Sequence, residues 1–186
     1  MSSVLNRLNA LSSVAMYALT TVALSAFLTT HFLPMEYPST FKLNKLMVRN
    51  IQEFETRASR NDVANLVFDL EFDTGPIWNW NTKQLFLYVV AEYQTEKNDI
   101  NRVVIWDKII LKKDIEKAKS TVVKYKNVKN KYYFFDDGAG LLNNQEVKFY
   151  LSYNVIANNG YFWLKTHEPS AKTYAMPDSY QVNKFY

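Results

Sequence analysis

Cysteine is absent from this 186-residue chain, and glycine and proline are scarce. Without cysteine the protein has no disulfides, no thiolate zinc ligands and no cysteine nucleophile. Four glycines and five prolines leave little material for long flexible linkers. The chain also contains no Asn-x-Ser/Thr sequon, so it offers no acceptor for N-glycosylation.

Histidine is nearly absent as well, with only His31 and His167 in the chain. A catalytic triad or dyad needs a base beside a nucleophile, and neither histidine has an evident nucleophile partner. His31 follows an apolar run, and His167 precedes Pro169 in a polar stretch that we expect to be a loop. Asp136 and Asp137 are adjacent, so on a strand they would point to opposite faces. No P-loop, G-x-S-x-G or dinucleotide fingerprint is present. We therefore predict no catalytic residue, no metal site and no cofactor.

The most prominent feature that is present is an uncharged run of 23 residues from Leu8 to Thr30. As a helix it would be roughly 34 Å long, enough to cross a hydrocarbon core of about 30 Å. Its hydroxyl residues can bond back to a carbonyl one turn earlier or face a partner helix. A signal peptide is the alternative, because Arg7 precedes the run and Ala23-Leu24-Ser25 imitates a cleavage site. Signal-peptide cores are about 7–15 residues long, so we favour a retained anchor.

The flanking charges predict the orientation of this anchor. The first 35 residues contain Arg7 and no acidic residue, and the positive end of an anchor stays in the cytosol. We predict a short cytosolic tail at 1–10, a signal-anchor helix at 11–33 and one domain at 34–186 across the membrane.

Period-two alternation in this domain predicts a mainly β fold, with Leu66, Phe68, Leu70 and Phe72 on one face of a strand. Further strands are expected at 41–48, 85–91, 103–111, 131–135, 146–156, 161–165 and 180–185, with 51–61 as a loop. The unbroken apolar run at 85–91 is typical of a strand covered on both faces. Polar residues at 96–101 can close a hairpin, Asp136-Asp137-Gly138 indicates a turn, and Asn158-Asn159-Gly160 indicates a type I′ hairpin. Seven or eight strands with at most one helix predict a β-sandwich.

Three clusters of polar or aromatic residues have two interpretations each. Asp69, Glu71 and Asp73 could hold calcium, although the solvent side of a sheet is the simpler explanation. Trp78 and Trp80 could stack on a sugar or a partner, or plug one end of the sandwich. Lys112 to Lys131 holds eight lysines against Asp114 and Glu116. We interpret that segment as a solvated loop or connecting helix; anionic lipid, an acidic partner and nucleic acid are alternatives, the last disfavoured by the predicted location.

Four segments resemble the signal peptidase complex subunit 3 family, the 22/23 kDa subunit of the microsomal signal peptidase. They are FDTGPIWNWNTKQLFLYVVAEY at 72–93, VVIWDKIIL at 103–111, KYYFFDDG at 131–138 and LSYNV at 151–155. The likeness covers essentially the whole chain in order, spacing and length. The residues that match the family motif are candidate partner contacts or fold determinants: Trp78, Trp80, Asn81, Lys83, Trp106, Asp107 and Lys108. Members often carry a sequon where this chain has Asn143-Asn144-Gln145-Glu146, so expectations about a glycan do not transfer.

The resemblance implies a single-pass type II protein of the endoplasmic reticulum membrane, with a lumenal β-sandwich and no catalytic role of its own. Its implied partners are the catalytic serine protease subunit, the two small membrane subunits and the lipid bilayer, with the protein translocation channel as a further candidate and no nucleic acid. A membrane-tethered glycan-binding module and an independent hydrolase are the rival interpretations.

Overall fold

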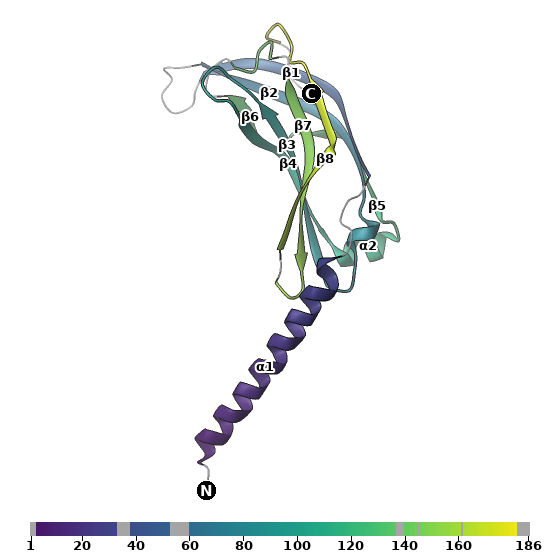
Figure 1. The fold of residues 1–186 in the computed structure, drawn as a ribbon. Helices are drawn as coiled ribbons and strands as arrows, with labels where there is room; N and C mark the ends of the chain where they lie inside the picture. Colours follow the sequence, from purple (N-terminus) through teal and green to yellow (C-terminus); the bar gives the residue numbers. More distant parts are fainter. Residues whose placement is uncertain are drawn as a thin grey trace.

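The computed structural model describes residues 3–32, 38–52, 60–136, 140–144, 146–160 and 162–181, with 162–170 as backbone only. One long helix leaves one end of a two-layered β domain (Figure 1). In chain order the elements are α1 (Val4–His31), β1 (Ser39–Gln52), β2 (Arg60–Asp73), the 3-10 turn η1 (Gly75–Ile77), β3 (Thr82–Tyr93), β4 (Asn101–Leu111), α2 (Lys112–Ala118), β5 (Val122–Lys129), β6 (Phe134–Asp136), β7 (Val147–Ala157) and β8 (Phe162–Tyr174).

Helix α1 is long and apolar enough to span a membrane, with a mean hydropathy of 1.7. Its hydroxyl side chains donate to carbonyls one turn earlier, as Ser25 Oγ does to Thr21 O at 2.8 Å. This back-bonding hides polar groups that lipid cannot satisfy. The predicted single membrane helix is confirmed, although it starts at Val4 and ends at His31. The predicted divisions at residues 10 and 33 stay predictions.

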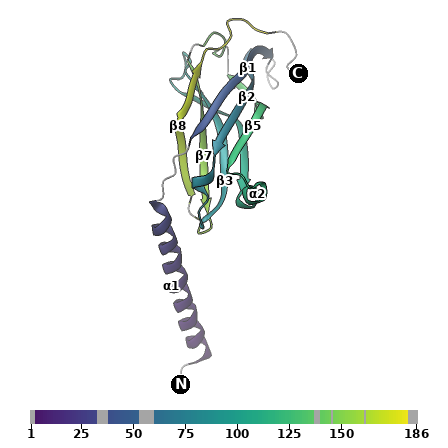
Figure 2. The same ribbon diagram turned by 90° about the vertical axis from the view of Figure 1, so that its right-hand side faces the viewer.

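The strands form two antiparallel sheets that pack face to face, which confirms the predicted mainly β fold (Figure 2). One sheet has the order β4-β3-β7-β8. The other has the order β1-β2-β5, and β6 also pairs with β2. Strand β2 accommodates both partners because β6 pairs with 62–64 and β5 with 67–73.

The core lies between the sheets and follows the predicted alternation. Leu66, Phe68, Leu70 and Phe72 of β2 are 2% exposed or less. From the other sheet, Phe149 stacks on Phe41 at 5.7 Å between ring centroids. Aromatic rings therefore fill much of the space between the layers, which makes disulfides unnecessary in a domain of this size.

The end of β1, the start of β2 and the burial of the outer face of β3 differ from the predictions. Ile51 and Gln52 belong to β1 and pair with Asn61 and Arg60, so the interval between the strands is shorter than the predicted loop at 51–61. The expectation that 85–91 is covered on both faces is wrong. Phe86 and Tyr88 lie half-buried on the outer face of β3, where their rings stack at 5.3 Å.

The lysine-rich segment is not a loop or a single helix, because α2 covers only 112–118 and β5 follows it. Val123, Tyr125 and Val128 of β5 pack against the core. The change in spacing between Tyr125 and Val128 is taken up at Asn127, whose φ is 51°, beside a register shift in β2. Partial burial of three apolar side chains against the core favours the strand, whereas lysines dominate the sequence pattern.

The last part of the chain also departs from expectation. Strand β8 runs to Tyr174, and His167 pairs with Leu151 inside it, so the predicted loop at His167 is wrong. Pro169 falls within a register shift of this edge strand, where a missing N–H is tolerated. Of the expected strand at 131–135 only residues 134 and 135 belong to β6, which ends at Asp136. Tyr180 and Gln181 lie outside any strand, and 182–185 are not among the described residues.

The two predicted turns have different outcomes. The β7–β8 hairpin is present, but positive φ is confined to Gly160, at 83°, and Gly160 N donates to Ala157 O at 3.2 Å. A type I′ turn needs two positive φ values, so the predicted turn type is wrong. Asp137 and Gly138 of the other predicted turn lie outside the described residues.

Candidate functional site at the junction of helix and sandwich

The structure separates the two tryptophans of the 78–83 segment. Trp78 is half-buried against the core, and its Nε1 donates to Thr74 Oγ1 at 2.8 Å. Trp80 is 62% exposed. Trp78 therefore closes the end of the sandwich, as one interpretation of the pair expected. Because only Trp80 projects into solvent, a two-ring platform for a sugar is not formed.

Asn81 is a buried polar centre that joins three parts of the molecule. Its Nδ2 donates to Thr30 Oγ1 at 3.2 Å, which links it to the last turn of α1. Its backbone oxygen accepts from Asn158 N at 2.7 Å, which links it to the β7–β8 hairpin. Its backbone N–H donates to Asn79 Oδ1 at 2.8 Å. Asn81 is 1% exposed and Thr30 is fully buried, so water competes little for these hydrogen-bonding groups.

Thr30 was one of several hydroxyl residues in the apolar run, and nothing in its spacing marked it as special. Its hydroxyl donates to Ala26 O at 2.7 Å and accepts from Asn81, so it is used both as a donor and as an acceptor.

Lys83, the last residue of the family motif in the 78–83 segment, is exposed on β3. Lys112 Nζ, at the start of α2, donates to Asn79 O at 3.1 Å and holds α2 against the same loop.

The second part of the family motif, 106–108, lies on edge strand β4. Trp106 is 7% exposed and packs edge-on against Phe68 and Tyr125. Asp107 is on the other face, where Oδ1 accepts from Lys131 Nζ at 2.6 Å and from Tyr132 OH at 2.7 Å. Ile105 O also accepts from the amides of Lys131 and Tyr132. These contacts hold the crossover from β5 to β6 against β4, and the side chains of Trp106 and Asp107 are both engaged within the chain.

Asp107 is held in its charged form by this environment. Burial by itself raises the pKa of Asp107, but the hydrogen bonds from Lys131 and Tyr132 and the lysine charge outweigh it. The pKa of Asp107 is consequently below its ordinary value. The same contacts raise the pKa of Lys131, with the hydrogen bond to Asp107 as the largest cause.

Lys108 is exposed at the edge of a cavity of about 260 Å³ between the end of β4, α2 and β5. Ile110, Ile115 and Val123 also line it, so the cavity is largely apolar with a lysine at its rim. It is large enough to receive an apolar side chain of another protein. The sequence does not predict it, because two of its walls are formed by α2 and β5, in the segment for which a solvated loop or connecting helix is expected.

The three carboxylates of β2 do not converge. Asp69 Oδ1 accepts from Asn127 N at 2.7 Å, Glu71 pairs with Lys124 at 2.7 Å, and Asp73 Oδ1 accepts from Gly75 N at 2.9 Å. The hydrogen bond from Asn127 is the main cause of the lowered pKa of Asp69. Each carboxylate has its own partner, and the described residues contain no cluster of three metal-ligating side chains.

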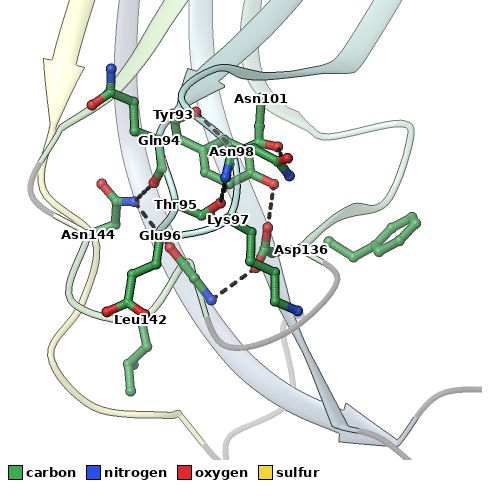
Figure 3. Close-up of a pocket in the computed structure, with 12 residues that line it drawn as sticks. Tyr93, Gln94, Thr95, Glu96, Lys97, Asn98, Asn101, Asp136, Leu142 and Asn144 are labelled. Carbon is green, nitrogen blue, oxygen red and sulfur yellow. Dashed lines mark hydrogen bonds between the residues drawn. The ribbon is translucent and has the colours of Figure 1, made fainter.

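A polar pocket of about 860 Å³ lies at the other end of the sandwich, between the β3–β4 loop and the residues Phe135, Asp136, Gly140, Leu142 and Asn144 (Figure 3). Asp136 accepts from Tyr93 OH at 2.9 Å and from Gly140 N at 3.0 Å. Burial and this carboxylate raise the pKa of Tyr93. A Cβ on Gly140 would lie 2.6 Å from Asp136 Oδ2, so a larger residue there would displace the carboxylate. The polar groups bond to one another and brace the loops.

An exposed aromatic strip, whose member Phe135 also lines this pocket, was not predicted, because 131–135 was expected to be a strand. Tyr132, Tyr133 and Phe135 are 44%, 75% and 54% exposed. Three neighbouring rings of this exposure on one stretch of chain are typical of a protein contact surface.

A β-sandwich carried on a single N-terminal transmembrane helix defines a class of membrane-anchored globular proteins. Comparison with known proteins narrows this class. A profile described as Signal peptidase subunit matches residues 1–179. The chain is 43% identical over 164 residues to Signal peptidase complex subunit 3 of Caenorhabditis elegans, covering 88% of each chain. It is 37% identical over 186 residues to the Homo sapiens protein of that name, covering 100% of each. The Drosophila melanogaster protein is 41% identical over 160 residues, covering 86% of this chain and 87% of that one.

This chain belongs to the signal peptidase complex subunit 3 family, as its sequence motifs indicated. Among solved structures, a putative ApaA protein from Bordetella pertussis has a TM-score of 0.33 and 10% identity, covering 78% of this chain and all of the other. That likeness is too low to carry an argument.

Proposed function

We propose that this protein is a non-catalytic accessory subunit of the signal peptidase complex in the endoplasmic reticulum membrane. In this proposal the helix α1 is a type II signal-anchor and the sandwich lies in the lumen. The sandwich positions the catalytic serine protease subunit for the removal of signal peptides from nascent secretory proteins. Two small membrane subunits and the lipid bilayer are further partners, and the translocation channel is a candidate.

The observation that carries the positioning role is the Asn81 junction. A domain that supports a membrane-bound protease must hold a constant height and orientation over the bilayer. The buried bond between Thr30 and Asn81 fixes the sandwich directly to the last turn of the membrane helix. The adjacent hairpin bond from Asn158 makes the same residue part of the sheet.

Two surfaces are suited to the partner subunits. The apolar cavity beside Lys108 can take an inserted side chain, and the aromatic strip at 132–135 offers a broader contact. Lys83 and Lys108 remain candidate contacts because both are exposed. Trp106, Asp107 and Asn81 are buried or bonded within the chain, so we expect their replacement to act through the fold.

The test is gentle detergent extraction of the tagged full-length protein, followed by identification of the chains that co-purify. We expect a serine protease subunit among them, and its absence would overturn the proposal. The variants Tyr133→Ser and Lys108→Ala should each reduce its recovery, whereas Lys97→Ala, exposed in the β3–β4 loop, is the matched control. Unchanged recovery with both variants would remove these two surfaces from the interface.

The rival glycan-binding function makes the opposite prediction. A glycan array probed with the detergent-solubilised full chain should give no hits if this protein is a complex subunit. Specific binding that is lost in Trp80→Ala would favour the rival.

A further inference from the structure

With α1 spanning the membrane as proposed above, the end of the sandwich from which α1 leaves lies at the surface of the membrane. Helix α1 has 28 residues, which gives a length of about 42 Å at 1.5 Å per residue. A bilayer with its headgroups is about 40–45 Å thick, so the last turn of α1 reaches the headgroup layer. The bond from Asn81 to Thr30 in this last turn places the 78–81 loop at the same depth.

Trp80 projects from this loop in a fixed conformation. Asn79 Oδ1 accepts from the amides of Asn81 and Thr82 at 2.8 and 3.1 Å, and Trp80 O accepts from Asn158 Nδ2 at 3.3 Å. The 62% exposure of the indole is therefore built into the loop. Indole rings concentrate at the membrane–water interface, because the ring has an apolar body and an N–H that donates to polar headgroups.

Four exposed lysines belong to elements at the same end of the domain as Trp80. Lys83 follows on β3, and Lys113, Lys117 and Lys119 belong to α2 or follow it directly; all four are exposed. Figures 1 and 2 both place α2 at the end from which α1 leaves, and Lys112 holds it to the tryptophan loop. Asp114 and Glu116 oppose these charges, and Asp114 is engaged by Leu111 N at the start of α2. The balance is positive, which suits phosphate groups.

We propose that this basal surface, consisting of Trp80, Lys83, Lys113, Lys117 and Lys119, rests on the phospholipid headgroup layer. Trp80 inserts its ring among the headgroups, and the lysines contact phosphates around it. The occupant is lipid because the surface is continuous with the helix that the bilayer already holds. This contact is a second attachment beside the Asn81 junction, and it resists tilting of the sandwich about the end of α1.

Spin labels on single cysteines test the depth of the basal surface. The chain contains no cysteine, so each engineered one is the only thiol. The full-length variants Trp80→Cys, Lys113→Cys and Lys97→Cys are placed in phosphatidylcholine vesicles, and collisions with oxygen and a water-soluble nickel complex are measured. Position 97 is the aqueous control, because β3 has 12 residues and separates it from the base by about 40 Å.

We expect the label at position 80 to collide several-fold more with oxygen and less with nickel than the label at 97. Position 113 should fall between them. A label at 80 that meets nickel as often as the label at 97 would overturn the proposal. In the assembled complex, shielding of position 80 from both reagents would overturn it in favour of a protein contact.

Native fluorescence provides an independent measurement without a label. Lipids brominated near the headgroup quench indoles at that depth, so Trp80→Phe should lose a large part of the quenched intensity of the wild type. Trp106→Phe, which keeps an aromatic ring at a core position that is 7% exposed, is the matched control once thermal unfolding has shown that this variant is folded. Equal quenching in the wild type and Trp80→Phe contradicts insertion of Trp80. Co-purification of a protease does not enter this test, so the two proposals fail separately.

Discussion

Asp107 illustrates how a single polar residue on an edge strand can decide the path of the chain. It holds Lys131 and Tyr132, the two residues at which the chain crosses from β5 to β6. Its neighbour Trp106 anchors the same strand from the core side. The motif residues 106 and 107 thus act as a pair on opposite faces of β4.

The lowered pKa of Asp107 gives a testable pH dependence. A carboxyl whose folded pKa lies below its unfolded value stabilises the fold above the unfolded value, and this contribution is lost as the pH falls through the folded pKa. We expect Asp107→Asn to be less stable than the wild type at neutral pH, with the difference shrinking below about pH 4. Thermal unfolding of the full chain in detergent at several pH values measures it. A difference that stays constant down to pH 2 would contradict the ion pair as its source.

Helix α1 has two roles that impose different demands on its sequence. Its length and the uncharged run from Leu8 to Thr30 suit it to span a membrane, and its back-bonded hydroxyls reduce the polarity that lipid would meet. A subunit of a signal-cleaving complex must also present a helix that is not itself cut. The uncharged run of 23 residues exceeds an ordinary signal core and offers a physical reason for its survival.

Shortening this run should convert it into a cleavable signal. Deletion of about eight residues from the middle of Leu8 to Thr30 leaves a core within the usual range of about 7–15 residues. We expect a shorter product on gels of the protein expressed in cells. Replacement of the same residues by an equal number of leucines is the control and should remain uncut. A full-length product from the deletion would count against length as the reason.

For the whole molecule, the decisive contact is the one between the helix and the sandwich. Thr30→Val keeps the shape of the side chain but removes the acceptor for Asn81 Nδ2. A hydrogen bond of this kind contributes about 1 kcal/mol, or roughly a five-fold change in the population of undocked molecules. Thr30→Ser retains the hydroxyl and is the matched control.

Distances between spin labels on Leu24→Cys and Lys83→Cys report this coupling in vesicles. We expect a broader distance distribution in Thr30→Val than in the parent, and a parental one in Thr30→Ser. If the valine variant keeps the parental width, the junction does not depend on this bond and the positioning role loses its main support.

Local patterns predicted much of the fold. The period-two alternation at 66–72 and 147–155 placed those side chains in the core, because a half-buried strand leaves that pattern in any context. The lysine-rich segment was not predicted as a strand, because the partial burial of three apolar residues outweighs several solvated lysines only once a core exists to pack against them. Likewise, His167 sits in a strand because β7 supplies the hydrogen bonds that the polar sequence around it does not predict.

The sequence by itself determined the membrane helix, the β class and the family, since length, charge and alternation act locally and the motifs at 72–93 and 103–111 are specific. The tertiary structure decided the roles of the motif residues. Residues 30 and 81 meet only after folding, at a sequence separation of 51. Trp78 and Trp80 are two residues apart, yet one lies against the core and the other points away from it, because the turn and the polar bonds of Asn79 and Asn81 orient them. No local pattern carries that information, since burial depends on what the rest of the chain brings alongside.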